Sequence, residues 1–589
     1  MPSFRDLAVV FLGEFFALYP LHATNAGMHD HDGRWPDLTD AGRQARIAFA
    51  DRWAATLEAL AGDDLELDDA VDRDLLLAEL AAIRFAEADL QEEAWSPLAW
   101  VYLIGEGLQP LIALDFATPA VRLESIAGRA EGLPAVLAAG RERLGSVPDR
   151  PVARLHADAA LERWSGLAAL LNDALALAAE AGPDDPAVGT IRPRLEAAVA
   201  VARTALAEFE AFLRTQILPG SEGEGRLGPD LFARKMSHTL QSDLSIADLR
   251  ARASREFDAV RVEMIRIARQ IAPRWLGEDS APADDGELVR AVLDAIAVEH
   301  PEPAELLDVC RAELARIEAF CREHNLIGLA DEPLELRWTP MFLRSSGGAL
   351  LHSPGPLDVG QKAFFSITPV DDGSPEEIES RLREDNDRML RLLTIHEAVP
   401  GHYLQGVYAN RCPSIMRSIF WSGVFAEGWA VYVTQVMMDA GYGADDAALL
   451  LTHWKFYLRS VTNALIDIDI HAGGMTEDAA VRLMVDGGFQ EDAAARGKYE
   501  RARLSSTQLS TYFVGSVEFW DLELAARRRA AAAIGVPPDE AVPEPALVGG
   551  FGDTPGFDRR AHLEACLSHG SPPMRLLRPL VLGDGQQPA

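Results

Sequence analysis

Residues 394–410 read TIHEAVPGHYLQGVYAN, and the segment HEAVPGH within them places two histidines six positions apart, at His396 and His402. Each residue of a regular helix turns about 100°, so histidines four positions apart share one face, which is how H-E-x-x-H binds a single metal ion. A separation of six places the two rings about 120° apart on an undistorted helix. A shared metal ion therefore requires an interruption of the helix between them.

Pro400 and Gly401 supply such an interruption. Pro400 lacks the amide hydrogen that would bond to the carbonyl of His396, and Gly401 accepts backbone angles that other residues resist. We predict a bulge or break at Val399, Pro400 and Gly401 that turns His402 back beside His396. Helix irregularities of this kind often mark functional sites.

A second predicted helix, FAEGWAVYVTQVMM, begins at Phe425 and carries Glu427 in its first turn. Zinc hydrolases that use two histidines and a carboxylate as ligands keep one coordination position for water. We therefore predict that His396, His402 and Glu427 bind one zinc ion. Glu397, next to His396, is then the general base that takes a proton from the attacking water.

Each of these residues taken singly also has a structural explanation. An H-E dipeptide is common, and His402 could simply follow a helix break. Glu427 could be a carboxylate that the helix dipole favours near an N-terminus. The order of the residues, the break and the second helix together favour the metal site.

Most of the remaining chain has the spacing of helices. In residues 191–218, apolar side chains recur at helical intervals behind Pro193. The segment 334–370 differs, because it alternates apolar and polar residues, ends in AFFSITPV and contains Gly and Pro turns, which predicts a small sheet. The edge of such a sheet could hold an extended peptide, although a structural ribbon explains the same pattern.

The Gly, Pro and acid-rich stretch at 218–230 is the strongest candidate boundary. It separates an N-terminal helical region, 1–217, from a catalytic region, 231–589. The catalytic region holds the sheet, at about 334–370, and the metal helices, at about 385–440. We expect the two regions to form one continuous body.

Composition restricts the partners and the compartment. The 589 residues carry a net charge of −36, which disfavours nucleic acid and anionic membranes as partners. The four cysteines are scattered and form no thiolate zinc motif. The apolar N-terminus is interrupted by Asp6 and Glu14, and no apolar run reaches spanning length. We expect a cytoplasmic protein with a peptide substrate.

The motif residues resemble a known family, the bacterial proteins grouped as domain of unknown function 885. Its hallmark, H-E-x-x-P-G-H-x-x-Q, is complete here with Gln405 as the last residue, and its E-G-W-A segment matches residues 427–430. The resemblance extends over most of the chain, from FFALYPLHATNAG to HLEACLSHGSPPMRLL. It is similar to the zincin-type metallopeptidases, which include the gluzincins and the helical oligopeptidases. The resemblance implies a large, mainly α, zincin-like body with the sheet next to the metal helices, and peptidase activity.

Two further family segments are altered in this chain. The pattern D-x-G-x-H-x-x-x-x-T keeps Asp467 and His471 but has Asp469 in place of glycine, and P-G-Q-A-x-x-Y appears as STQLSTY, with Gln508 and Tyr512. In related peptidases a late tyrosine or histidine stabilises the oxyanion, so the resemblance implies catalytic roles for Tyr512 and His471. The structural alternatives are a buried aromatic ring and a core histidine held by Asp467.

The sequence thus predicts a zinc-dependent peptidase, and two other readings stay open. One is a helical scaffold or binding protein that keeps the metal motif without turnover, and the other is a zinc amidase that acts on a non-peptide substrate. Arg501 and Arg503 could pair with the terminal carboxylate of a peptide, but an arginine is more often a solvated surface charge.

Overall fold

The structure, a computed structural model, describes residues 3–60, 65–181, 185–278, 280–339, 344, 348–358, 360–542, 548 and 550–583. Within these residues the chain is mainly helical and contains one three-stranded sheet. The predicted mainly α fold with a small sheet is confirmed.

The chain divides into two compact units. The first comprises Met1–Arg226 and Pro354–Gln361, and the second comprises Leu227–Ser353 and Lys362–Ala589. The short segment Pro354–Gln361 is therefore grouped with the first unit, although it lies in the sequence between two strands of the second.

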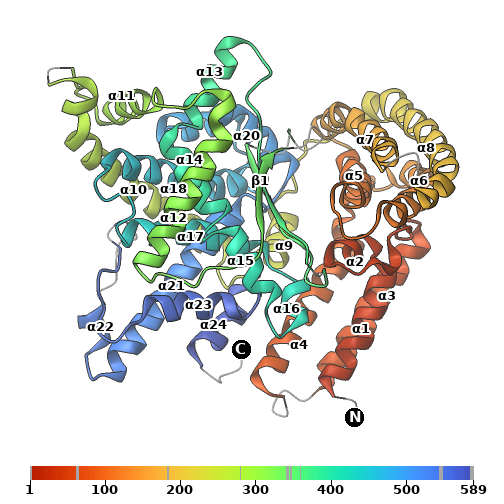
Figure 1. The fold of residues 1–589 in the computed structure, drawn as a ribbon, viewed down its shortest axis with the longest axis horizontal. Helices are drawn as coiled ribbons and strands as arrows, with labels where there is room; N and C mark the ends of the chain where they lie inside the picture. Colours follow the sequence, from red (N-terminus) through yellow and green to blue (C-terminus); the bar gives the residue numbers. More distant parts are fainter. Residues whose placement is uncertain are drawn as a thin grey trace. The chain divides into compact units, whose positions relative to one another are not determined.

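The first unit is built from paired helices, drawn in red to yellow in Figure 1. Helix α8 packs along α6, α5 along α7, and α3 along α4. Capping residues mark where these helices begin. Asp185 caps α8, which has proline at its first position, and Ser3 caps α1. The elements are α1 (Phe4–Leu18), α2 (Pro20–Ala26), η1 (His29–His31), α3 (Asp40–Glu58), α4 (Leu67–Phe85), η3 (Ala86–Leu90), η4 (Glu92–Ala94), α5 (Pro97–Ala113), α6 (Pro119–Arg143), α7 (Arg154–Glu180), α8 (Pro186–Phe212), η5 (Leu213–Ile217) and η6 (Leu218–Gly220).

The segment Pro354–Gln361 is held in the first unit by hydrogen bonds to the N-terminal helices. The amide of Leu357 donates to the carbonyl of Ala26 over 2.8 Å. The His29 ring lies between two carboxylates, with Nδ1 2.8 Å from Asp32 and Nε2 3.2 Å from Asp358. Burial opposes the charged ring, but these two carboxylates raise the pKa of His29 to about 9.

The second unit contains the sheet and the remaining helices. Helix α17 packs along α21, and α10 packs along α18, around a core that includes Trp429 and Trp454. The helical elements are α9 (Pro229–Leu240), α10 (Ile246–Leu276), α11 (Asp285–Ala297), η7 (Pro303–Glu305), α12 (Leu306–Glu323), α13 (Pro375–Glu384), α14 (Asp387–Glu397), α15 (His402–Asn410), α16 (Ile415–Ile419), α17 (Gly423–Asp439), α18 (Ala447–His471), α19 (Glu477–Arg482), η9 (Leu483–Gly487), α20 (Asp492–Leu504), α21 (Ser510–Ala533), α22 (Pro538–Ala541), α23 (Arg559–Ser568) and α24 (Met574–Leu582).

The sheet has the strand order β1-β3-β2, with bounds β1 (Leu334–Trp338), β2 (Ala349–His352) and β3 (Ala363–Ile367). Strand β3 pairs parallel to β1 and antiparallel to β2, and all five of its residues are buried. The strands fall within the predicted segment 334–370, of which residues 340–343, 345–347 and 359 lie outside the described residues. Strand β2 packs against α14 and α15, the helices that carry the histidine motif.

In the described part of the chain, no single helix is both long and apolar enough to cross a membrane. Helices α1 and α2 pass that test only as a pair, and they are bent by 117° relative to each other.

Candidate metal centre

The helix that carries His396 ends where the sequence predicts an interruption. Helix α14 ends at Glu397, and α15 begins at His402, so that Ala398 to Gly401 form the break. The amide of Gly401 donates to the carbonyl of Ile395 over 3.0 Å, which closes the connection into a tight loop. The predicted break is therefore present, and it places His402 at the first position of a new helix.

Two features hold this loop in place. The indole Nε1–H of Trp429, from α17, donates to the carbonyl of Pro400 over 2.8 Å. A Cβ atom at Gly401 would lie 1.9 Å from the carbonyl oxygen of His396, so the turn leaves no room for a side chain there. The loop is thus fixed by a glycine inside it and by an aromatic residue of the helix that carries Glu427.

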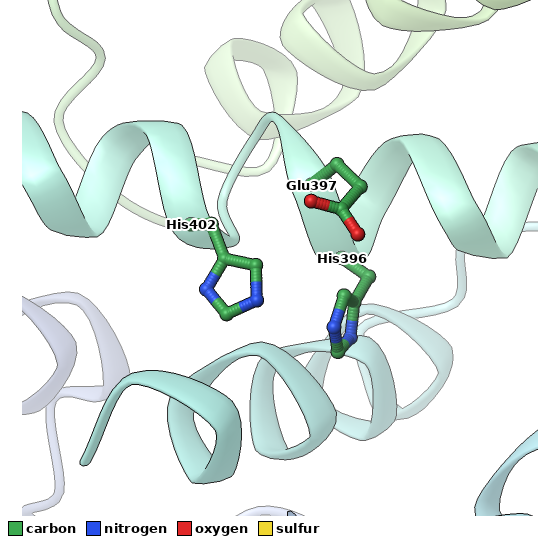
Figure 2. Close-up of side chains that lie close together, drawn as sticks. All are labelled: His396, Glu397 and His402. Carbon is green, nitrogen blue, oxygen red and sulfur yellow. The ribbon is translucent and has the colours of Figure 1, made fainter. Parts of the chain in front are cut away.

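The break brings the motif side chains to one place, with His396 and Glu397 at the end of one helix and His402 at the start of the next (Figure 2). Ligand atoms of these three residues all lie within 4.8 Å of one another. The carboxylate oxygen Oε2 of Glu427 lies 3.8 Å from His396 Nε2 and 3.5 Å from His402 Nε2. The three predicted ligands therefore converge, and Glu397 belongs to the same cluster.

These side chains fit a tetrahedral zinc ion. Ligand atoms at about 2.0–2.1 Å from zinc are separated from one another by roughly 3.3 Å, close to the separations that Glu427 makes with the two rings. The Nδ1 atom of His396 is buried and has no hydrogen-bond partner among the described residues, so none of them fixes the ring's orientation through that atom. Two imidazole nitrogens and one carboxylate oxygen form a donor set that zinc accepts.

Burial and mutual charge set the protonation of the cluster. Burial lowers the pKa of His396 to about 3, which keeps its imidazole neutral. Burial raises the pKa of Glu397 to about 7, with the Glu427 charge adding to the effect. For His402, burial opposes the charged ring, but the hydrogen bond to Glu427 and the nearby carboxylates raise its pKa. Burial likewise opposes the Glu427 charge, and its contacts with His402, His396 and Tyr512 lower its pKa.

Tyr512, in the first turn of α21, faces this cluster. A hydrogen bond between its phenol and Glu427 contributes to the lowered pKa of that carboxyl, and the side-chain amide of Gln508 donates to the phenol oxygen over 3.3 Å. Burial raises the pKa of Tyr512 to about 12, so the phenol stays protonated at neutral pH. Helices α17 and α21 approach closely, because a Cβ at Gly428 would lie 2.3 Å from Gly515.

His471, the other residue predicted for the oxyanion, has a different set of neighbours. Its Nε2–H donates to the carbonyl of Ala502 over 2.8 Å, and its Nδ1 accepts from the amide of Leu227 over 3.4 Å. The buried ring also stacks on Phe232. Both ring nitrogens are engaged by backbone groups, whereas the Tyr512 phenol is the group that contacts Glu427.

The sequence reasoning missed the positioning residues of the centre. The E-G-W-A segment predicts only Glu427, yet Gly428 permits the close helix crossing and Trp429 holds the break. Gln405 at the end of the hallmark motif donates to the Ser571 hydroxyl and so ties α15 to the late segment HLEACLSHGSPPMRLL. A glycine inside a helix, as at Gly515 in α21, is the sequence signal for such a close crossing.

A helical body with two imidazoles and a carboxylate gathered at a helix break defines a candidate metalloprotein. The chain belongs to the family described as "Bacterial protein of unknown function (DUF885)", whose model matches residues 20–581. No curated protein matches it.

Two solved structures have a similar fold. A protein from Shewanella oneidensis, described as "a putative lipoprotein of unknown function", is 28% identical, and the match covers 99% of this chain and 100% of that chain with a TM-score of 0.80. A protein from Colwellia psychrerythraea, described as a "putative lipoprotein", is 15% identical, with 98% of each chain covered and a TM-score of 0.77. The second likeness concerns the fold alone.

Proposed function

We propose that the protein is a zinc-dependent hydrolase of peptide bonds, of the zincin type and similar to the gluzincins. One observation carries the proposal: the Glu427 carboxylate lies 3.5 Å and 3.8 Å from the Nε2 atoms of the two motif histidines. Glu397 lies in the same cluster as a carboxylate that need not be a ligand. Three ligands and one spare acid are the parts of a hydrolytic zinc site.

In this proposal His396, His402 and Glu427 hold one zinc ion. Bound zinc would supply a Lewis acid that polarises a carbonyl and lowers the pKa of water. The chain's own part is to fix the two rings, through the Trp429 contact with the break, and to fix Glu427, through its contact with Tyr512. Residues that orient ligands in this way commonly change metal affinity when they are replaced.

Glu397 is the general base of the proposed reaction. Its carboxylate takes the proton that the attacking water loses and then gives that proton to the nitrogen of the leaving amine. This transfer needs a carboxylate close to the metal ligands but not committed to the ion, and Glu397 lies within 4.8 Å of ligand atoms of both histidines.

Tyr512 stabilises the negative charge that develops on the attacked carbonyl oxygen. Its phenol is a neutral donor and already contacts Glu427, so it stands next to the proposed metal ligands. A donor placed where charge develops commonly contributes two to three orders of magnitude to the rate. His471 was the alternative, but its ring nitrogens bond to Ala502 and Leu227.

The sheet supports a peptide as the substrate. Strand β2 is one of the two end strands in the described order β1-β3-β2, and it packs against α14 and α15. An end strand offers backbone donors and acceptors that an extended peptide can pair with. A chain lying along β2 would therefore run beside the helices of the metal centre.

The variant Glu397→Gln tests the proposal. Purified wild type and variant are loaded with zinc, their metal content is measured, and each digests a peptide library that is read by mass spectrometry. We expect cleavage by the wild type, a loss of at least about 100-fold in the variant and nearly equal zinc content. Glu323→Gln, at an exposed position in α12, is the matched control.

Two results would contradict the proposal. One is equal cleavage by the Glu397→Gln variant and the wild type at equal zinc content. The other is a zinc-loaded wild type that cleaves no peptide in the library, which would favour the scaffold or the amidase. The cytoplasmic location and the exclusion of nucleic acid and membrane partners stay predictions, and the word lipoprotein describes the two similar proteins.

A further inference from the structure

Four basic side chains lie on two helices that contact the surroundings of the metal centre, in a protein with a net charge of −36. Lys455 and Arg459 lie on α18, and Lys498 and Arg501 lie on α20. We call these four residues the cationic cluster. The proposed reaction uses none of them, so their concentration next to the centre needs a separate explanation.

The carboxylates near the cluster do not balance its charge. Glu384 pairs with Lys455 over 3.2 Å and with Arg459 over 3.0 Å. Burial, reinforced by the neighbouring Glu384 charge, raises the pKa of Asp385 to about 6, which weakens its contribution as an anion. Among the residues that the structure describes, no carboxylate lies within ion-pair distance of Lys498 or Arg501.

The charge of Lys498 is not stabilised by its surroundings. Burial lowers the pKa of this amine well below its usual value, and the charges of Arg459 and Arg501 act in the same direction. The Glu384 carboxylate opposes the shift but does not cancel it. An additional anion at this position would therefore relieve an electrostatic cost that the folded chain already carries.

Hydrogen bonds connect the cluster to the metal ligands. The Arg501 guanidinium donates to Gln508 Oε1 over 2.9 Å, and the Gln508 amide donates to the Tyr512 phenol over 3.3 Å. The phenol in turn contacts Glu427. The Arg501 guanidinium, which forms no ion pair with the described residues, thus lies a few hydrogen bonds from the place where the proposed ion and the attacked carbonyl would meet.

A second route leads to His396. The ring of Phe456 meets the His396 ring edge-on at a centroid distance of 5.6 Å, and the Arg459 guanidinium carbon lies 5.9 Å from the Phe456 centroid. The Arg459 charge also acts on the His396 ring and contributes to its lowered pKa. The cluster therefore adjoins the centre from α18 as well as from α20.

We propose that the cationic cluster, through Arg501 and Lys498, binds a carboxylate of the substrate next to the bond that is cleaved. The inference rests on the proposed function and adds the class of substrate, an anionic peptide. Two hydrogen bonds, of 2.9 Å and 3.3 Å, connect Arg501 to the Tyr512 phenol, and an extended chain advances about 3.3–3.6 Å per residue, so such a carboxylate belongs within a few residues of the attacked carbonyl. It is either the terminal carboxylate of the peptide or the side chain of an aspartate or glutamate.

Binding, rather than turnover, tests this inference. Titration calorimetry with the zinc-loaded Glu397→Gln variant compares three forms of one short neutral peptide: a free acid, a C-terminal amide, and an amide that carries one glutamate near its end. We expect the free acid to bind about tenfold more tightly than the plain amide, because it forms a charge-assisted pair with the guanidinium. If the glutamate peptide binds as tightly as the free acid, the site also accepts acidic side chains.

Variants of α20 provide the matched comparison. Arg501→Gln, added to Glu397→Gln, should reduce the acid-to-amide ratio to about one, and Lys498→Gln should reduce it in the same direction. Arg496→Gln removes a charge from the same helix. Arg496 and Arg501 are both exposed, but Arg496 pairs with Asp492 and Glu477, so the ratio should persist. Raising the salt concentration should weaken the preference of the parent protein.

Three results would overturn the inference: equal binding of all three peptides, no binding of any peptide, or a ratio that survives in both the Arg501→Gln and the Lys498→Gln variants. These measurements need no catalysis, so they are distinguishable from failure of the proposed function. A protein that binds free-acid peptides in preference to amides but cleaves none would keep the carboxylate site and lose the hydrolase.

Discussion

The Oε2 atom of Glu427 lies 3.5 Å from the Nε2 atom of His402, although the two residues belong to different helices, α17 and α15. The contact exists because α14 stops early and a new helix starts at His402. Helix spacing alone would separate the two motif histidines, so the site depends on tertiary structure around the break.

Replacing Glu427 should remove a proposed zinc ligand and leave the two histidines in place. We expect Glu427→Gln to lower zinc affinity by at least about 10–100-fold, the range seen when only an outer partner of a ligand is lost. Competition with a chromophoric chelator measures the affinity. Unchanged affinity would show that the carboxylate does not bind the ion, and Glu323→Gln serves as the control.

Gly401 should tolerate no side chain. A Cβ there would lie 1.9 Å from the carbonyl oxygen of His396, so Gly401→Ala must shift the loop between the two histidines. We expect the free energy of unfolding to fall by about 1–3 kcal/mol and zinc affinity to fall with it. At Gly423, the first residue of α17, an added Cβ meets no atom within 4 Å, so Gly423→Ala is the matched control. Equal behaviour of the two variants would contradict this account of the loop.

Tyr512→Phe should slow catalysis at saturating zinc, and the loss of its contact with Glu427 should also lower zinc affinity by about 10-fold. The variant loses the donor that contacts Glu427 but keeps the ring, so we expect kcat to fall about 100- to 1000-fold with a small change in KM. Steady-state kinetics on one defined peptide measures both constants. His471→Asn is the comparison: because its ring bonds to Ala502 and Leu227, we expect a lower melting temperature and a smaller change in kcat. The reverse pattern would assign the oxyanion role to His471.

Protonation of Glu384 at low pH should lower the stability of the protein. The Lys455 ammonium lowers the pKa of Glu384 to about 2, and the Arg459 charge acts in the same direction. Burial opposes this shift. A carboxyl whose pKa is lower in the folded state stabilises the fold at pH values above its unfolded pKa, near 4.5, and this stabilisation is lost as the pH falls towards 2. We expect Glu384→Gln to cost on the order of 3 kcal/mol at pH 7.

Urea unfolding of wild type and Glu384→Gln at a series of pH values tests this sign. The difference between the two proteins should be largest at neutral pH and should narrow below about pH 4.5. A difference that stays constant down to pH 3 would show that the ion pairs with Lys455 and Arg459 do not stabilise the fold.

Local chemistry made part of this arrangement predictable. Pro400 and Gly401 predict a break in the helix, because Pro400 lacks an amide hydrogen and Gly401 lacks a side chain. The structure has that break. The alternation at the start of 334–370 likewise indicated the sheet. The sequence singles out Glu427 as a candidate because a zinc site requires a third ligand and a helix with an early acid follows the motif.

The rest depends on contacts between segments that are distant in the sequence. No spacing rule shows that the Trp429 indole reaches the Pro400 carbonyl, or that one Glu384 carboxylate is shared by two basic residues of α18. His471 is an example. Its sequence pattern is compatible both with a catalytic ring and with a ring that bonds to backbone groups, and the structure has the second arrangement. Such contacts are decided by packing, which a single sequence does not display.

The grouping of Pro354–Gln361 with the first unit has a consequence for how the gene can be divided. This short stretch is grouped with the first unit, through bonds such as Leu357 to Ala26, yet its codons lie between those of β2 and β3. If the gene is divided between the codons of Arg226 and Leu227, neither fragment encodes a complete unit. The first fragment lacks Pro354–Gln361, and the second carries that segment in addition to its own unit. Recombination that exchanged one unit between relatives would have to replace two separate pieces of the reading frame at once.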